Sequence, residues 1–449
     1  MPIEPDQNSY RDPAGFVFEK DGIIYRQINH SYQPHYQKLK SSGLYQELIG
    51  QGLLLPHEEV NLKTGTNAYC IIRPEQIHVI TRPNQWTYDM LKDAAELTLK
   101  IQDICLKYAM TLKDAHPSNV QFIGGKPIFI DSLSFEIRTD NEPWIAYRQY
   151  CESFLLPLVI GHYSGTDSTK LLAAWPKGIP LEMGSTFLPI RARLNLHWSL
   201  HIFLNGRIGR SRKTNIKKKP KLTEDEFKRL IQSLKIATRK CKPRPHSENW
   251  INYSKEAKTR GRYSELKTDI LLKWKTQLQN IASILDLGAN TGEYAQLLAG
   301  AQTRTIQIES DADSCNESYR KNKQGFAKNT DTLCMDFEEF IGHRNSRLKR
   351  SIASDVVLCL GLLHHLLYKS NIPISYVVET LKELTSSYLI IEYISPEDDV
   401  IDEYFNLQLI ELRMCRMEDF DEALKQHFNI IEKVKILDST RLLYLCKRS

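Results

Sequence analysis

The stretch Ile284-Leu-Asp-Leu-Gly-Ala-Asn-Thr-Gly-Glu293 decides the fold of the second half of the chain. A short apolar run contains Asp286 and leads into a turn with Gly288 and Gly292, after which a helical pattern begins. Glycine lets the backbone approach a ligand closely, and the free N–H groups of the following helix would face that ligand. The spacing differs from the G-x-G-x-x-G of dinucleotide sites, and an acid before the first glycine suits a cationic ligand better than a pyrophosphate.

Short apolar runs alternate with helical patterns around this turn. Strands are expected at Ser283–Leu287, Thr305–Ile308, Thr332–Met335, Asp355–Leu360, Tyr388–Tyr393, Asn429–Leu437 and Arg441–Cys446. Helices are expected around Tyr294–Ala299, Ala312–Lys323, Ser375–Leu384 and Glu418–His427. Such alternation predicts an α/β fold with a doubly wound sheet of parallel strands covered on both faces. Only three residues separate the last two of the seven strands, so these two must form an antiparallel hairpin.

These features together resemble the class I S-adenosylmethionine-dependent methyltransferases, whose first motif reads acid-x-Gly-x-Gly-x-Gly. Asn290 stands at the middle glycine, and Asn is the other residue that best tolerates a positive φ. The resemblance implies a Rossmann-like sheet with S-adenosylmethionine as cofactor, Glu309 on the two ribose hydroxyls and Asp336 on the adenine amino group. The cofactor-binding residues it implies are Asp286, Gly288, Asn290, Gly292, Glu309, Asp336 and Leu360. The alternative is a doubly wound fold of another kind, because acids near strand ends are common in such folds.

Two histidines follow the fourth strand in the segment Leu360-Gly-Leu-Leu-His-His-Leu366. In the resembling methyltransferases a His-His-Leu segment lines the active site, so His364 or His365 is a candidate proton acceptor. Either ring could instead bond the backbone. Adjacent side chains point in different directions, so we expect no metal site in this domain.

Further candidates lie at the end of the fifth strand and before the first. Glu392 and Tyr393 are candidate substrate contacts, because ligands bind at the carboxyl ends of strands in such sheets. The acids that follow, up to Asp399, either contact substrate or belong to a solvated loop with a helix cap. Tyr263 and Lys267 either fold over the cofactor or belong to an ordinary amphipathic helix.

The first half predicts a separate α+β unit. Strands are expected at Phe16–Phe18, Ile23–Ile28 and Ala68–Ile72, helices at Gln37–Ile49 and Thr87–Tyr108, and a hairpin of Val120–Ile123 with Pro127–Ile130 around Gly124-Gly125. Leu112–Phe122 and Ile128–Ser132 resemble the catalytic loop and the metal-binding Asp of protein-kinase-like and aminoglycoside-phosphotransferase-like folds.

This second resemblance implies a nucleotide site with ATP and Mg²⁺. Asp114 would orient an acceptor hydroxyl, while Asn119 and Asp131 would hold Mg²⁺ on the phosphates. Arg26 stands where the family has its phosphate-binding Lys, and Glu47 where it has the partner of that Lys. The glycine-rich loop is missing, so nucleotide binding without turnover and a purely structural remnant remain alternatives to phosphotransfer.

A basic connector joins the two halves. Eight Lys or Arg residues and no acid lie between Asn205 and Lys221, so the formal charge of +6 leaves 6 − 8 = −2 for the rest of the chain. We expect a kinase-like domain at 1–204, the connector at 205–222, and a methyltransferase domain at 223–449 that begins with a helix capped by Thr223. The connector could bind nucleic acid, which would make RNA the methyl acceptor, but a charge run between domains is more often a solvated linker.

Composition bounds the remaining possibilities. The chain has 449 residues, 41% hydrophobic, and nine scattered cysteines without a CxxC pair, which predicts a globular protein with reduced thiols. A polar N-terminus and short apolar runs predict a cytoplasmic protein without membrane insertion. Together with Ile130–Glu136 and Ala146–Tyr150, the segment Leu360–Leu366 resembles bacterial two-domain proteins related to nodulation-type methyltransferases. We expect transfer to an oxygen or nitrogen of a small-molecule or glycan-type acceptor.

Overall fold

The computed structural model describes residues 12–62, 67–206, 221–244, 262–327, 329–342, 346–398, 415–437 and 439–449. Most of the basic connector expected at 205–222 lies outside the described residues, and so does Asp399. In the described ranges, no helix combines the length and the apolar character that crossing a membrane requires.

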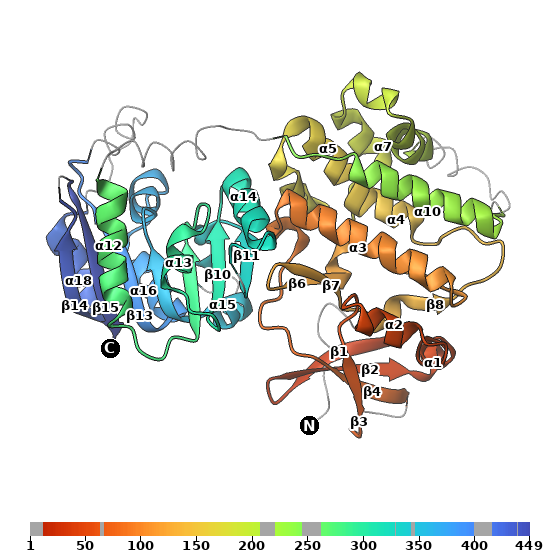
Figure 1. Ribbon diagram of the computed structural model, residues 1–449, viewed down its shortest axis with the longest axis horizontal. Coiled ribbons are helices and arrows are strands. Elements are labelled where there is room, and N and C mark those ends of the chain that lie inside the picture. Colours follow the sequence, from red (N-terminus) through yellow and green to blue (C-terminus); the bar gives the residue numbers. More distant parts are fainter. Residues whose placement is uncertain are drawn as a thin grey trace.

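The second half is built on one seven-stranded sheet (Figure 1) with the order β11-β10-β9-β12-β13-β15-β14. The strands are β9 (Ser283–Leu287), β10 (Arg304–Glu309), β11 (Thr330–Cys334), β12 (Ser354–Cys359), β13 (Thr385–Ile394), β14 (Phe428–Lys435) and β15 (Arg441–Arg448). The first five pair in parallel, whereas β15 pairs antiparallel with both β13 and β14. The predicted doubly wound sheet with a closing hairpin is therefore confirmed.

Helices cover both faces of this sheet. They are α12 (Tyr263–Lys275), α13 (Glu293–Leu298), α14 (Ala312–Lys323), α15 (Ser346–Ile352), α16 (Ile374–Leu384) and α18 (Met417–Lys425). Because successive strand residues point to opposite faces, Ile284 packs with α12 and α13 while Leu285 packs with α16 and α18. Burial on both faces explains why the central strands are continuous apolar runs.

The first unit begins with an antiparallel sheet of order β1-β2-β4-β3. Its elements are β1 (Gly15–Lys20), β2 (Ile23–Asn29), α1 (Gln33–Ser41), α2 (Leu44–Gly50), β3 (His57–Val60) and β4 (Ala68–Pro74). The single helix predicted at 37–49 is two helices, because Gly43 adopts a φ of +92° and ends the helical conformation between them. Glycine alone takes this conformation without a side-chain penalty.

Helix α3 (Tyr88–Leu106) is the central element of the first unit (Figure 1). It begins where predicted, with the side chain of Thr87 accepting a hydrogen bond from the amide of Met90. Around it lie β5 (Met110–Leu112) paired with β8 (Phe135–Ile137), the predicted hairpin of β6 (Val120–Ile123) with β7 (Lys126–Phe129), and the helices α4 (Tyr147–Tyr150), α5 (Leu156–Ser164), α6 (Leu171–Ala174), α7 (Leu181–Gly184), α8 (Leu196–Trp198) and α10 (Glu224–Arg239).

Helix α10 has the predicted cap but belongs to the other half. Thr223 accepts from the amide of Glu226, as expected. However, its apolar stripe of Phe227, Ile231 and Leu234 joins the same core cluster as α3. The helix at 224–239 thus packs on the first unit, while the expected domain boundaries stay a prediction.

The two units meet where α3 lies beside α14 (Figure 1). Tyr319 of α14 is only 1% exposed, is part of the core cluster of the first unit, and donates to Asp93 at 2.7 Å. Ion pairs of Arg320 with Asp89 (2.5 Å) and of Lys323 with Asp93 (2.6 Å) flank it. The tyrosine is therefore an anchor that joins the halves.

Replacing this anchor should weaken the whole molecule. We expect Tyr319→Ala to lower the free energy of unfolding by about 3–5 kcal/mol, because a large buried side chain leaves a cavity. Tyr376→Ala is the matched control, since Tyr376 is 52% exposed and its loss should cost about 0.5 kcal/mol or less. Urea unfolding followed by circular dichroism measures both, and equal effects would contradict the anchoring role.

Candidate active site

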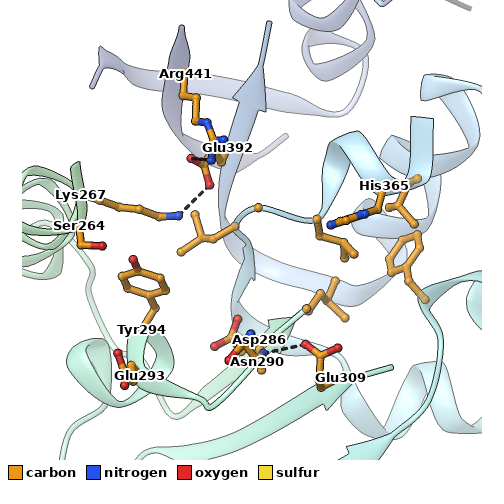
Figure 2. Close-up of a pocket in the computed structure, with 18 of the residues that line it drawn as sticks. Ser264, Lys267, Asp286, Asn290, Glu293, Tyr294, Glu309, His365, Glu392 and Arg441 are labelled. Atoms are coloured by element: carbon orange, nitrogen blue, oxygen red, sulfur yellow. Dashed lines mark hydrogen bonds and ion pairs between the residues drawn. The ribbon is translucent and has the colours of Figure 1, made fainter. Parts of the chain in front are cut away.

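A cavity of about 1750 Å³ lies at the carboxyl ends of β9, β10, β11, β12 and β13 (Figure 2). Pockets for one small ligand usually measure about 300–1,000 Å³, so this cavity has room for two molecules side by side. Its wall includes Tyr263, Lys267, Asp286, Gly288, Asn290, Tyr294, Glu309, Met335, Asp336, Phe337, Leu360, His365, Glu392, Asp398 and Arg441. It occupies the place where ligands bind in open α/β sheets.

The glycine turn forms the floor of the cavity. Gly288 has a φ of +70° and Asn290 a φ of +48°, so Asn290 adopts the conformation that its place in the motif requires. The amides of Gly288 and Ala289 both donate to the carbonyl of Ile308, which ties the turn to β10. The Asn290 Oδ1 atom is buried and has no hydrogen-bond partner among the described residues, so it can accept a hydrogen bond from a ligand.

Two acids stand on either side of this turn. Asp286 is 3% exposed, and burial, reinforced by the charge of Glu309, raises its pKa to about 7. Glu309 accepts from the amides of Asn290 and Asp311, each at 2.8 Å. A carboxylate has about four acceptor positions, so Glu309 keeps capacity for the two hydroxyls of a diol. Burial raises the pKa of Glu309 as well.

Most of the predicted cofactor residues lie on the wall, and one does not. Asp336 follows β11 and Leu360 follows β12, and both line the cavity. Gly292 is absent from the lining and packs against Gln307, whose Nε2 atom donates to the Gly292 carbonyl at 3.1 Å. With a φ of +80° and the Gln307 side chain against it, Gly292 allows close packing of the helix on the strand, and its role in cofactor binding stays a prediction.

The two histidines differ in position. His365 lines the cavity on the side opposite Lys267 and Tyr294 (Figure 2), whereas His364 is 1% exposed and is absent from the lining. Burial, with the charge of Lys369, lowers the pKa of His365 to about 4, so its imidazole is neutral at neutral pH. By its position in the lining, His365 is the histidine of the two that can contact a molecule in the cavity.

The end of β13 contributes one of its two predicted contacts. Glu392 lines the cavity, accepts from Lys267 Nζ at 2.7 Å and from the Tyr263 hydroxyl, and is 0% exposed. Tyr393 points to the other face of the sheet, where its hydroxyl donates to the carbonyl of Cys415 at 3.0 Å. Because neighbouring strand residues alternate between faces, the prediction of Tyr393 as a substrate contact is wrong.

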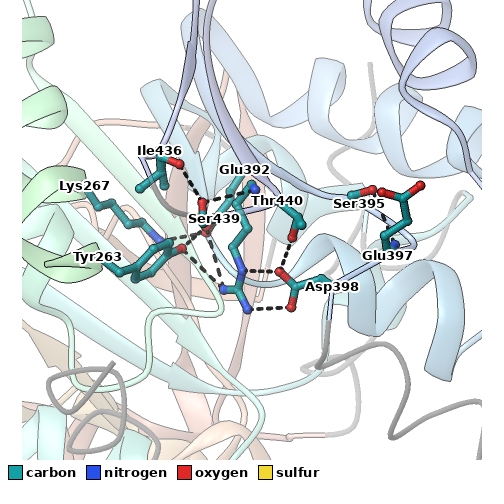
Figure 3. A network of polar contacts seen from close by, with 10 residues as sticks. Tyr263, Lys267, Glu392, Ser395, Glu397, Asp398, Ile436, Ser439 and Thr440 are labelled. Carbon is teal, nitrogen blue, oxygen red and sulfur yellow. Dashed lines mark hydrogen bonds and ion pairs between the residues drawn. The ribbon is translucent and has the colours of Figure 1, made fainter. Parts of the chain in front are cut away.

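Glu392 belongs to a buried polar network (Figure 3). Arg441, the first residue of β15, contacts Asp398 at 3.0 and 3.1 Å, and Thr440 donates to Asp398 at 2.6 Å. Burial alone would raise the pKa of Glu392, but the charges of Lys267 and Arg441 outweigh it and hold the pKa below its ordinary value. Two cations and two acids thus balance at one end of the cavity.

Sequence reasoning missed the roles of Arg441 and Asp398. Nothing near either residue in the sequence indicates a partner 43 positions away. The sequence left two alternatives for the acids after β13, namely substrate contact or a solvated loop. Asp398 is 7% exposed and forms a buried ion pair with Arg441.

The second predicted constellation is partly assembled in the first unit. Arg26 Nη1 lies 2.5 Å from Asp131, which also accepts from the amide of Leu133 and the hydroxyl of Ser134. Asn119 donates to the same Ser134 hydroxyl at 3.1 Å. Arg26, Asn119 and Asp131 therefore lie together, but an arginine occupies the carboxylate that Mg²⁺ would need.

The other two members of this constellation are bound elsewhere. Asp114 accepts from Gln149 at 2.8 Å and from the amide of His116. Glu47 accepts from the Tyr108 hydroxyl and lies 3.6 Å from Lys107, so its predicted pairing with Arg26 is wrong. Across the described part of the chain, no group of three or more His, Cys, Asp or Glu residues is placed to hold a metal ion. The kinase-like interpretation of 1–204, with ATP and Mg²⁺, stays a prediction.

Comparisons with known proteins give a relative over nearly the whole chain and solved structures that match part of it. No protein-family model matches the chain. Nodulation protein NoeA of Rhizobium meliloti (strain 1021) is 25% identical over 460 residues, which cover 98% of this chain and 95% of NoeA.

Several of the similar solved structures are methyltransferases. The magnesium protoporphyrin IX methyltransferase ChlM of Synechocystis PCC 6803, with bound SAH, is 17% identical at a TM-score of 0.32 and covers 41% of this chain and 82% of its own. The N-methyltransferase NodS of Bradyrhizobium japonicum WM9 is 12% identical at a TM-score of 0.32 and covers 42% of this chain and 97% of its own. Likeness at this level does not define a function, so the functional case rests on the cavity itself.

The buried ion pair offers a direct test of the network. We expect Lys267→Met to lower the free energy of unfolding by about 3–5 kcal/mol, because the buried Glu392 carboxylate loses its nearest cation. The deficit should shrink as the pH falls, since the unpaired Glu392 then takes up a proton, whereas in the wild type the lowered pKa of Glu392 makes stability fall with the pH.

Lys273→Met is the control on the same helix. Its ion pair with Glu432 is exposed, with 63% of the Lys273 side chain accessible, so about 1 kcal/mol or less should be lost. Urea unfolding at neutral and acidic pH measures both variants. A pH-independent deficit in Lys267→Met would contradict the assignment.

Proposed function

We propose that this protein transfers a methyl group from S-adenosylmethionine to an oxygen or nitrogen nucleophile. The observation that carries the proposal is the convergence of Asp286, the turn at Gly288 and Asn290, and Glu309 on one cavity at the ends of a seven-stranded sheet. The strand order and the antiparallel hairpin agree with the resemblance to class I methyltransferases seen in the sequence.

The donor groups of the site fit this cofactor. Glu309 retains acceptor positions for the two ribose hydroxyls after bonding Asn290 and Asp311. Asp286, when ionised, places a negative charge near a ligand that carries a sulfonium cation. The unpartnered Asn290 Oδ1 atom supplies one more acceptor. Met335, Asp336 and Phe337 line the adjoining wall, where the resemblance places the adenine.

The chain itself has little covalent chemistry to perform. S-adenosylmethionine supplies an already activated methyl carbon when it is bound. The cavity must align the acceptor atom with that carbon and exclude water. His365 lines the cavity, so we assign to one of its ring nitrogens the proton that the acceptor loses. The size of the cavity supports a small-molecule or glycan-type acceptor beside the cofactor.

Cofactor binding should depend on the ionisation of Asp286. We expect the affinity of the full-length protein for S-adenosylmethionine to fall as the pH drops below about 7, because Asp286 then takes up a proton and loses its charge. Asp286→Asn should bind about tenfold more weakly at pH 8, or about 1.4 kcal/mol, and should lose most of this pH dependence.

Isothermal titration calorimetry between about pH 6 and 8 measures these affinities. Asp103→Asn serves as the control, because this exposed residue of α3 pairs with Lys235 away from the cavity. If the wild-type protein takes up no S-adenosylmethionine at any pH, the proposed function itself fails.

Replacing each of the two histidines should affect the rate of methyl transfer differently. We expect His365→Ala to lower methyl transfer by about 10²-fold or more while leaving cofactor affinity nearly unchanged, because only the proton acceptor is lost. His364→Ala, which lies behind the wall, should keep a larger share of the activity.

Radiolabelled methyl transfer to fractionated lysate measures turnover and also reveals the acceptor. Gly288→Val provides the blank, since a side chain at a φ of +70° against Leu362 would distort the turn. Full activity in His365→Ala would remove this residue from the reaction.

A further inference from the structure

The first unit carries a concentrated set of exposed apolar side chains near its end. Ile190, Leu194 and Leu196 are 82%, 86% and 77% exposed, and Leu200 and Leu204 are also exposed. We call these five residues the leucine surface. Soluble proteins seldom gather large apolar side chains in water unless the patch binds something.

The helical spacing of these leucines shows that they form a second, exposed apolar face on α8 and the turns that continue it. Leu196, Leu200 and Leu204 follow one another at intervals of four residues along α8 and the helical turns that continue it to Leu204. The opposite face is already buried, since Trp198 and Ile202 belong to the core and Trp198 donates to the carbonyl of Ala237. A helix on a globular protein needs one apolar face to fold, so the outer one is available for docking.

The stretch of sequence that carries this surface contains positive charges and no acidic residue. From Met183 to Thr223 the chain contains ten Lys or Arg residues and no Asp or Glu. Arg191 and Arg193 lie in the same turn as Ile190 and Leu194, and their guanidinium groups lie over the rings of Tyr163 and Phe203 at 5.2 and 5.1 Å. The other eight cations follow in the sequence of the connector, most of which lies outside the described residues.

We propose that the leucine surface docks onto an anionic membrane. Exposed leucines beside arginines are the composition of segments that lie in the headgroup region, where apolar side chains enter the lipid and basic groups contact the lipid phosphates. A nucleic acid would satisfy the cations but would leave the leucines in water. The proposed contact is peripheral. This inference is independent of the methyl transfer proposed above.

Vesicle sedimentation of the full-length protein tests this surface. We expect the wild type to sediment with phosphatidylcholine vesicles that contain roughly a third phosphatidylglycerol, and to stay in solution with phosphatidylcholine alone. Added salt should release it, because the electrostatic part of the attraction is screened. The double variant Leu194→Glu/Leu196→Glu should lose about tenfold or more of its partitioning.

The matched control places the same two charges elsewhere. Leu272 and Ile431 are 42% and 48% exposed in the second unit, so Leu272→Glu/Ile431→Glu should sediment like the wild type. Thermal melts check folding, and the salt dependence of the wild type needs no variant at all.

Three outcomes would overturn the proposal. The first is a wild type that ignores the anionic vesicles, and the second is a Leu194→Glu/Leu196→Glu variant that binds them equally well. The third is a wild type that forms dimers by light scattering, or retains RNA on filters, without binding vesicles. That result would assign the surface to a second copy of the chain or to a nucleic acid.

Discussion

The ion pair between Lys267 and Glu392 is the constraint on which the shape of the cavity depends. It joins α12 to the end of β13 in a region where both side chains are almost completely buried. Removing two charges from water is costly, and only partners in good geometry offset that cost. Tyr263 and Arg441 supply those partners, which fixes α12, β13 and the closing hairpin relative to one another.

The first unit contacts the part of the second unit that carries Glu309. Thr166 donates to Asp313, and Lys170 donates to the carbonyl of Ser310, which directly follows Glu309. The amide of Gly124 at the tip of the β6–β7 hairpin donates to Asp331 at 2.9 Å. The contact of Lys170 with Ser310 therefore supports the wall next to Glu309 from outside its own sheet, whereas the wall at Glu392 is held by residues of the second unit alone.

Local patterns predicted much of this structure, and long-range pairing accounts for the rest. The strand at 283–287 and the helix at 312–323 have the bounds that the sequence predicted. The spacing of apolar residues and the residues that flank them are local features, so a single sequence shows them. The N-cap of α10 at Thr223 was also predicted from local sequence. No local pattern indicates which of the two cores the apolar stripe of α10 joins. The Arg26–Asp131 pair and the Arg441–Asp398 pair are likewise products of chain topology, which a single sequence does not display.

The buried Tyr319 sets a limit on how this protein can be dissected. Cutting the chain between the units would expose an aromatic ring and the apolar face around Phe122 and Trp86 that receives it, while Asp89 and Asp93 would lose their cations. Each half would then expose an apolar patch beside unpaired charges of one sign, and exposed apolar patches favour aggregation in solution. The intact chain is therefore the natural unit for expression, crystallisation and assay.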